Sequence, residues 1–406
     1  MSTKENIPEL RFKEFGDKWE GHTLGDLGSV AMNKRIFKHQ TSMTGEVPFF
    51  KIGTFGKEPD AYISRELFED YKARYPYPNS GDLLLSASGS IGKVVEYKGE
   101  DQYFQDSNIV WLKHDGKIDN SFLKVFYSNA KWSGLEGSTI KRLYNKNILD
   151  TEIYTPSECE QAEIGNYFQK LDTLINQHQQ KHDKLSNLKK AMLEKMFPKA
   201  GESVPEIRFD GFSGYWFEVQ LGEIARIKGR LGWKSLKQNE YVSNGPAMIA
   251  GKHIESGQID WSKVDHIPEW RYRESPEIML KNGDVIFSKD GSLGNPAVVS
   301  NLHIEATINS TMMLVRPGNY LDSHFFYQVL NSKVFNNLIK EKVSGSSIPH
   351  LFQADMKLFK FYSTSVEEQH QIGVYFKQLD MLINQHHKQI TKLKNIKQAC
   401  LDKMFV

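Results

Sequence analysis

Basic and aromatic side chains are interleaved in four short stretches of this sequence, with the chemistry needed to contact nucleic acid. The stretches are "NKRIFKH" (33–39), "STIKRLYNKN" (138–147), "RIKGRLGWK" (226–234) and "EWRYRE" (269–274). Lys and Arg contact phosphates, whereas Arg, Asn and aromatic rings also contact base edges or stack on bases. The candidate contacts are Lys34, Arg35, Lys38, Lys141, Arg142, Asn145, Lys228, Arg230, Trp233, Lys234, Arg271 and Arg273.

A plainer interpretation is open for each stretch, because charged residues also occupy ordinary solvated loops. The net charge of the 406-residue chain is only +2, so any nucleic-acid surface must be local. The recurrence at 33–39 and 226–234, each just after the first predicted strand of its half, favours the functional interpretation. Residue types alone do not separate base contacts from phosphate contacts.

Two glycine-containing stretches approach the pattern of a phosphate-binding loop without its key residues. "ASGSIGKV" (87–94) has Ala87 for the first glycine and Val94 where a magnesium-binding hydroxyl belongs, and its counterpart has Asn295 for the lysine. We predict a turn between two strands, with glycines at positive φ, and interpret Asp290 as a solvated turn residue. The sequence has no HExxH, GxSxG or GxGxxG motif, so we propose no catalytic, cofactor-binding or metal-binding residue.

The composition is that of a globular protein with two or three domains, with 39% hydrophobic and 25% charged residues. No apolar run reaches the roughly 18 residues that span a bilayer, and the first residues lack the apolar segment of a signal peptide. Cys159 and Cys400 have no CxxC spacing, and we expect two reduced thiols. These features predict a cytoplasmic protein with no membrane partner.

The chain contains a duplicated unit of about 200 residues, in which four segments recur in the same order. The pairs are "IPELRFKEFGDKW" (7–19) with "VPEIRFDGFSGYW" (204–216), "GDLLLSASGSIG" (81–92) with "GDVIFSKDGSLG" (283–294), "EGSTIKRLY" (136–144) with "SGSSIPHLF" (344–352), and "IGNYFQKLDTLINQH" (164–178) with "IGVYFKQLDMLINQH" (372–386). The last pair shares eleven of fifteen residues. Two copies are too few for a solenoid, so each must have its own core.

Each unit ends in a predicted long helix, at 157–198 and 365–406. Both begin with a serine followed three residues later by a glutamate, the pattern of a capping box. Apolar residues then alternate at spacings of three and four, which is the period of a coiled coil. The residues expected to form the seam between the helices are Ile164, Phe168, Leu171, Ile175, His178, Leu185, Ile372, Phe376, Leu379, Ile383, His386 and Leu393.

Two similar units joined head to tail should close about a pseudo-twofold axis, so we expect the helices to pair antiparallel. His178 and His386 lie near the middle of their helices and should meet at the crossing. We interpret them as polar residues that fix the register, with a metal or catalytic role as the alternative. A helix of some 38 residues is a rod of roughly 55–60 Å, which could hold two domains apart. The N-terminus should lie near the end of the second helix.

We therefore predict an α+β fold. Two pseudo-repeated mixed α/β domains are separated by two long helices packed as an antiparallel coiled coil, in a pseudo-twofold, circular arrangement. The predicted division is 1–156 for the first domain, 157–198 for the first helix, 199–364 for the second domain and 365–406 for the second helix.

The combination of motifs resembles the specificity (S) subunit of type I restriction–modification enzymes. The resemblance covers essentially the whole chain. It is carried by "EQAEIGNYFQKLD" (160–172) and "EQHQIGVYFKQLD" (368–380), the "PELRF" and "PEIRF" segments, and the "GD…S..GS.G" turns. It implies that 1–156 and 199–364 are target-recognition domains, each binding one half-site of a bipartite double-stranded DNA target. The helices would be the constant spacer between them.

The resemblance also implies partners. Two modification (methyltransferase) subunits would dock on the helices and methylate adenine, and restriction subunits would supply ATP-driven translocation and cleavage. The chain would then be a non-catalytic subunit without a cofactor of its own. S-adenosylmethionine, ATP and Mg are expected on the partner subunits.

Two other functions stay open at this point. A two-domain scaffold or adaptor that binds proteins or glycans would show no sequence-dependent or salt-dependent affinity for DNA. An enzyme with an unrecognised site would consume a methyl donor or cut DNA without a partner.

Overall fold

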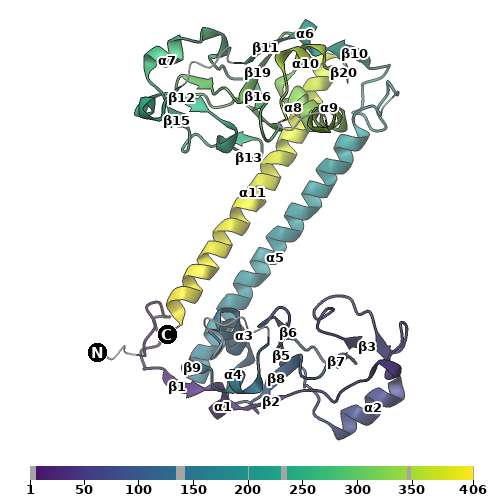
Figure 1. Cartoon of the computed structure of the whole chain (residues 1–406), viewed down its shortest axis with the longest axis vertical. Coiled ribbons are helices and arrows are strands. Elements are labelled where there is room, and N and C mark those ends of the chain that lie inside the picture. Colours follow the sequence, from purple (N-terminus) through teal and green to yellow (C-terminus); the bar gives the residue numbers. More distant parts are fainter. Residues whose placement is uncertain (1–5, 134–141, 200, 230–235, 345–348, 406) are drawn as a thin grey trace. The chain divides into compact units, whose positions relative to one another are not determined.

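The computed structural model describes residues 6–133, 142–199, 201–229, 236–344 and 349–405. The chain divides into two compact units: unit 1 is Met1–Gln177 with Gln389–Val406, and unit 2 is His178–Lys388. Each unit therefore combines a globular domain with a stretch of each long helix (Figure 1). No helix formed by the described residues is long and apolar enough to cross a membrane.

The described residues of the domain in unit 1 form nine short strands and four α-helices, followed by the long helix α5. In chain order the elements are β1 (Glu20–Thr23), α1 (Leu24–Leu27), β2 (Ser29–Ala31), β3 (Val47–Phe50), β4 (Tyr62–Ile63), α2 (Arg65–Arg74), β5 (Leu83–Ser86), β6 (Val94–Glu96), β7 (Tyr103–Phe104), β8 (Ile109–Lys113), α3 (Asn120–Asn129), α4 (Asn145–Leu149), β9 (Glu152–Thr155) and α5 (Glu158–Lys195). A 3-10 turn, Lys38–Gln40, lies between β2 and β3.

The domain of unit 2 follows the same order, with additional short elements, and ends in the long helix α11. Its elements are β10 (Phe217–Gln220), α6 (Leu221–Ile224), β11 (Ala225–Gly229), β12 (Val242–Ile249), β13 (Ile254–Glu255), β14 (Gln258–Ile259), β15 (Asp265–His266), α7 (Glu269–Arg273), β16 (Val285–Ser288), β17 (Gly294–Val298), β18 (Ala306–Ile308), β19 (Met312–Pro317), α8 (Ser323–Asn331), α9 (Lys333–Ser344), α10 (Gln353–Leu358), β20 (Lys360–Ser363) and α11 (Val366–Met404).

The sheets of the two units have matching topology. An antiparallel four-stranded sheet has the order β2-β8-β5-β6 in unit 1 and β11-β19-β16-β17 in unit 2. Each unit also has a three-stranded sheet, with the order β4-β3-β7 in unit 1 and β15-β12-β18 in unit 2. Its middle strand pairs antiparallel with one neighbour and parallel with the other. The antiparallel pair β1–β9, or β10–β20, brings the start of each domain to its end. The predicted mixed α/β duplication is confirmed.

The four-stranded sheet of unit 1 has an apolar cluster on each face. Leu85 and Leu112 belong to the cluster that contains Phe122 of α3, whereas Leu84 and Trp111 belong to the cluster that contains Phe104 of β7. The two sets alternate along the strands because successive side chains of a strand point to opposite faces. This double burial explains why β5 and β8 are continuous apolar runs in the sequence.

The start of each long helix is fixed by a buried ion pair. The Arg11 guanidinium donates to both carboxylate oxygens of Glu160 (2.7 and 2.6 Å), and Arg208 does the same to Glu368 (2.6 and 2.7 Å). Both glutamates are fully buried. One half of each predicted capping box is present, because the serine hydroxyl accepts from the glutamate N–H, at 3.5 and 3.3 Å. The other half was predicted wrongly, because the glutamate carboxylate binds an arginine.

The next residues of the repeated motif attach each helix to its domain. In unit 1 the side chain of Gln161 accepts from the Asp119 N–H (2.9 Å) and donates to the Pro156 carbonyl (2.9 Å). Gln369 contacts the equivalent Asp322 N–H (2.9 Å) in unit 2. A Cβ at Gly165 would lie 1.7 Å from the hydroxyl of Ser121, so only glycine allows this approach between α5 and α3.

The helices are antiparallel within each unit, since residue numbers rise on one helix as they fall on the other. In unit 1, Lys397 of α11 contacts Asp172 of α5 (2.6 Å). In unit 2, Lys189 of α5 contacts Asp380 of α11 (2.6 Å). The second pair is the first with the helices exchanged, because Asp380 is the repeat counterpart of Asp172 and Lys397 is that of Lys189.

The predicted seam residues occupy two environments. The first three of each helix are fully buried in the cores of their domains: Ile164, Phe168 and Leu171 in unit 1, and Ile372, Phe376 and Leu379 in unit 2. The other six are half-buried: Ile175, His178, Leu185, Ile383, His386 and Leu393. The core of unit 1 also contains Leu401 and Met404 of α11, so domain packing and helix packing share one cluster.

The segment that precedes the first strand of each domain (β1 or β10) lies beside the end of one long helix. In unit 1 the Leu10 N–H donates to the carbonyl of Lys403, the penultimate residue of α11 (2.9 Å). In unit 2 the Ile207 N–H donates to the carbonyl of Lys195 at the end of α5 (2.9 Å). The expected proximity of the N-terminal segment to the end of the second helix is thus observed in unit 1.

Two histidines meet between the helices in unit 2. The Nδ1 atoms of His178 and His386 are 2.9 Å apart, so one ring donates and the other accepts. The His182 and His387 rings lie 6.1 Å apart beside them. Burial, followed by the neighbouring His178, Lys181 and His182, lowers the pKa of His386. Within the described residues no three His, Cys, Asp or Glu side chains are placed to hold a metal ion.

Replacing Arg11 by Ala should destabilise unit 1 by about 3–5 kcal/mol, because a buried carboxylate loses its charged partner. Urea denaturation of the full chain measures this change. The matched control is Arg74→Ala, which breaks the exposed pair with Asp70 and should cost less than about 0.5 kcal/mol. Adding Glu160→Gln to Arg11→Ala should restore part of the loss, since a neutral amide is easier to bury. Equal losses of stability in Arg11→Ala and Arg74→Ala would contradict the interpretation of Arg11–Glu160 as a stabilising buried pair.

The lowered pKa of His386 predicts a loss of stability in mild acid. A histidine whose folded pKa is depressed destabilises the fold when protons bind, so the loss begins as pH falls below about 6.5 and continues through the lower folded pKa. The free energy of unfolding should therefore fall between pH 7.5 and 5. In the double variant His178→Gln/His386→Gln this fall should be smaller, whereas His39→Gln, at an exposed histidine that stacks on Phe37, should leave it unchanged. Equal pH dependence of all three proteins would exclude the His pair as the cause.

Candidate nucleic-acid interface

Three segments converge at one end of the four-stranded sheet in each unit. Tip 1 consists of residues 86–92, 105–108 and 142–144, and tip 2 of the equivalent residues 288–294, 308–311 and 350–352. The turns 86–92 and 288–294 connect β5 to β6 and β16 to β17. Gly89, Gly92, Gly291 and Gly294 have positive φ, so the predicted turns between strands are confirmed.

The tips share the same backbone hydrogen bonds. In tip 1 the Ala87 N–H donates to the Asn108 carbonyl (2.8 Å), and the Leu143 N–H donates to the Ala87 carbonyl (2.7 Å). In tip 2 Lys289 takes the place of Ala87: its N–H donates to Thr311 (2.8 Å), and its carbonyl accepts from Leu351 (2.9 Å). This frame uses main-chain atoms only, so it tolerates different side chains in the two domains.

Two predicted basic residues from distant stretches meet at tip 1. Arg35 donates from Nε to Asp106 (3.0 Å), and Arg142 donates to the carbonyl of the next residue, Ser107 (3.0 Å). The Arg142 guanidinium also lies 5.9 Å from the ring centre of Tyr144, which is 57% exposed. Arg35 thus joins Arg142 and Tyr144 in one basic and aromatic surface.

The other described candidates of unit 1 lie on the same two chain segments as Arg35 and Arg142. Lys34 is exposed and lies 5.0 Å from the ring centre of Tyr75. Lys38 is exposed in the 3-10 turn after β2, and Asn145 is exposed at the first position of α4, directly after Tyr144. None of these side chains belongs to a core cluster, so all remain available to a ligand.

Tip 2 presents side chains that the sequence analysis did not select. His350 donates from Nδ1 to the Asp290 carboxylate, which also contacts the Lys289 ammonium (3.3 Å). The rings of His350 and Phe352 are 4.2 Å apart, and Phe352 is 60% exposed. Asp290 is therefore a half-buried ion-pair partner and not the solvated turn residue that we expected. The repeat of 136–144 at 344–352, which aligns Arg142 with His350, was the signal that could have identified this site.

The candidates of unit 2 fall into separate groups. Lys228 is half-buried on β11, next to Gly229, where an added Cβ would lie 3.6 Å from the Lys289 side chain. Arg271 and Arg273 lie on α7, which packs on β12 instead of the four-stranded sheet. Arg271 makes a bidentate pair with Glu240 and is 12% exposed, whereas Arg273, paired with Glu269, is 73% exposed. Lys141, Arg230, Trp233 and Lys234 lie outside the described residues.

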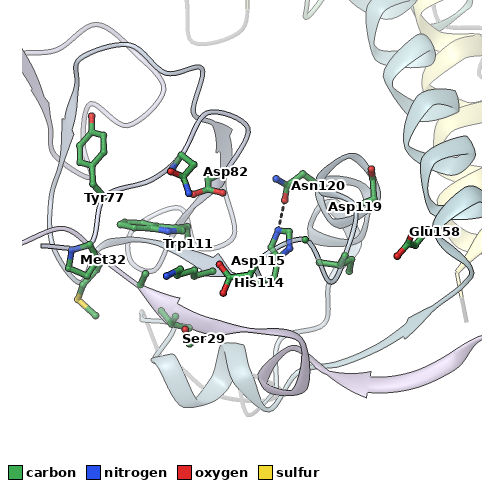
Figure 2. A pocket seen from close by; sticks show the side chains of 17 residues that line it. Ser29, Met32, Tyr77, Asp82, Trp111, His114, Asp115, Asp119, Asn120 and Glu158 are labelled. Carbon is green, nitrogen blue, oxygen red and sulfur yellow. Dashed lines mark hydrogen bonds between the residues drawn. The ribbon is translucent and has the colours of Figure 1, made fainter. Parts of the chain in front are cut away.

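A cleft of about 1100 Å³ beside β2 and β8 is lined by acidic residues, in contrast to the basic surface of tip 1 (Figure 2). Its acidic lining residues are Asp82, Asp115, Asp119 and Glu158. His114 lies in the same cleft and contacts Asn120 (2.8 Å). None of the eight described candidate residues lines it. Because carboxylates repel phosphate groups, this cleft is not where unit 1 would contact a nucleic-acid backbone.

Comparison with known proteins agrees with this architecture. The profile of the type I restriction modification DNA specificity domain matches the chain twice, over residues 16–187 and 215–395. The chain belongs to this family. Each match contains one complete tip together with part of one long helix, so the chain combines two copies of the specificity domain.

Individual relatives extend the similarity to both sequence and fold. A putative type I restriction enzyme specificity subunit of Haemophilus influenzae is 54% identical over 154 residues, which are 38% of this chain and 40% of that protein. The MjaVIII specificity subunit of Methanocaldococcus jannaschii is 22% identical over 420 residues, covering 98% and 95%. The crystal structure of the S subunit from M. genitalium matches 98% of this chain and 99% of its own, with a TM-score of 0.67 and 18% identity.

Proposed function

We propose that this specificity subunit binds a bipartite double-stranded DNA target, with one half-site contacted by each domain and an unrecognised gap between them. The observation that supports this most directly is the pair of specificity-domain matches, each containing one of the two equivalent tips. The tips share a main-chain frame but differ in the side chains that they present. Two different half-sites require such a combination of constant geometry and variable chemistry.

The exposed cations around tip 1 suit a DNA surface. The Arg35 side chain is 61% exposed, and Lys34 and Lys38 are exposed on the same segment. We assign these three to phosphate contacts, which fix orientation and depend on salt. Arg142 has donors only and lies on the tip itself, so we assign it to a base edge rich in acceptors, such as guanine.

The catalytic steps are proposed to reside on partner subunits. Relatives are named specificity subunits of restriction enzymes, which supports an assembly of this chain with separate modification and restriction subunits. Two modification subunits would dock on the long helices and bring S-adenosylmethionine, and restriction subunits would bring the ATP and Mg chemistry. Extrusion of the target adenine into the methyltransferase site would be a step of the partner.

Exchange of the first domain should change only one half of the methylated motif. The experiment replaces residues 1–156 by the equivalent domain of a relative, expresses the chain with its methyltransferase partner, and sequences the methylome. We expect a new first half-site, an unchanged second half-site and an unchanged gap. A strain that carries the partner alone is the control. If no motif depends on this chain while the partner is active, the scaffold or adaptor function becomes the better explanation.

Substitution of two arginines should separate DNA recognition from stability. Arg142→Ala should weaken binding to the cognate duplex by roughly 5- to 150-fold, the equivalent of about 1–3 kcal/mol, with a smaller effect on unrelated DNA. Arg271→Ala should instead lower the melting temperature, because Glu240 loses its bidentate partner, and should leave DNA affinity within about threefold. Fluorescence anisotropy of the complex with the methyltransferase measures the affinity. Similar losses for both variants would contradict the assignment of Arg142 to base recognition.

A further inference from the structure

His350 is held in place more tightly than an incidental surface histidine. Its Nδ1–H is bound by Asp290, and the Asp290 carboxylate is itself held by Lys289, which is only 14% exposed. Phe352 packs against the imidazole with ring centres 4.2 Å apart. A side chain fixed on two sides loses little rotamer entropy when it contacts a ligand, so this arrangement is preorganised for binding.

The fixed orientation leaves one atom of His350 for a partner. With Nδ1 occupied by Asp290, only Nε2 remains, which accepts a hydrogen bond in the neutral ring and donates one in the charged ring. The side chain is 30% exposed, so the site is accessible. The aromatic ring of Phe352, 60% exposed beside it, offers an apolar surface such as a thymine methyl group prefers.

The equivalent position in unit 1 has a different chemistry on the same frame. The isolated bridge Ser88–Arg142 in tip 1 corresponds to the bridge Asp290–His350 in tip 2. Both residues are followed at the second position by an exposed aromatic side chain, Tyr144 or Phe352. If this position served only a structural requirement shared by the two domains, it would have similar side chains in both. Recognition of two different base pairs explains why one domain has a guanidinium and the other a carboxylate-bound imidazole.

We propose that His350, positioned by Asp290, contacts a base edge in the half-site bound by unit 2, with Phe352 covering the same or the adjacent base pair. This inference rests on the proposed function, because it requires that the two domains bind two half-sites. His350 is then the specificity-determining residue at one position of the second half-site. Asp290 is a positioning residue that acts through His350.

The test is methylome sequencing of strains that express the full chain together with its methyltransferase partner. In His350→Ala we expect relaxed recognition at one position of the second half-site, with the preferred base favoured about five- to tenfold less. The first half-site and the gap should not change. Asp290→Asn should relax the same position, because the amide holds the ring less firmly. His350→Gln keeps one hydrogen-bonding group near the base and should retain more discrimination than His350→Ala.

His303→Ala is the matched control, and it should give the wild-type motif. His303 is an exposed histidine of unit 2 whose Nδ1 makes a hydrogen bond (2.9 Å) and whose ring contacts Trp261. It lies in the loop after β17, at the end of β17 that is remote from tip 2. Several outcomes would overturn the proposal. They are an unchanged motif in His350→Ala, a uniform fall in methylation with all positions retained in both His350 variants, or relaxation in the first half-site.

The wild-type strain separates this inference from the proposed function on which it rests. If the wild-type chain directs a bipartite motif but His350→Ala and His350→Gln leave every position as selective as before, only the role of His350 is refuted. If the wild-type chain directs no motif, although the partner methylates DNA with another specificity subunit, the proposed function itself is refuted.

Discussion

The buried pair between an arginine of the segment before each domain's first strand and a glutamate in the first turn of the long helix supports the rest of the architecture. A carboxylate that is 1% exposed would be very unfavourable alone, so Glu160 and Glu368 each require the bidentate partner provided by Arg11 or Arg208. The pair joins the segment before the first strand of a domain to the long helix that follows the last strand of that domain. Strand pairs β1–β9 and β10–β20 close the same junction with main-chain hydrogen bonds.

This junction explains why the helices recur so closely while the domains diverge. Each of several residues in the motif makes a different contact: the glutamate binds arginine, Gln161 accepts from the N–H of Asp119, the N-cap of α3, and Gly165 leaves room for Ser121. Ile164 and Phe168 fill the domain core, and Asp172 binds the opposite helix. A substitution at any of these positions affects several contacts. The tips have no such constraint, because their frame is made of main-chain hydrogen bonds.

Much of the fold was predictable from the sequence because the repeat supplies two independent samples of one pattern. The three–four spacing indicated the long helices, and the shared glycines indicated the turns between strands. The candidate site was less accessible. Arg35 and Arg142 are 107 positions apart in the sequence, and only the strand order brings both to the turn at Asp106 and Ser107. Arg271 had the composition of a DNA contact, but Glu240, which is 31 residues away, occupies its guanidinium.

The sequence by itself determined the duplication and the two long helices, since these follow from local period and from segments repeated in the same order. The resemblance of its motifs to those of a known family indicated the DNA-specificity function. Tertiary structure alone decided the partners of each ionisable group. Glu160 has the sequence position of a capping carboxylate, yet it binds an arginine 149 residues away, and Asp290 binds a histidine 60 residues away. Such partners are set by burial and by the geometry of distant chain segments, because an ionised group removed from water pairs with whichever opposite charge the fold places beside it.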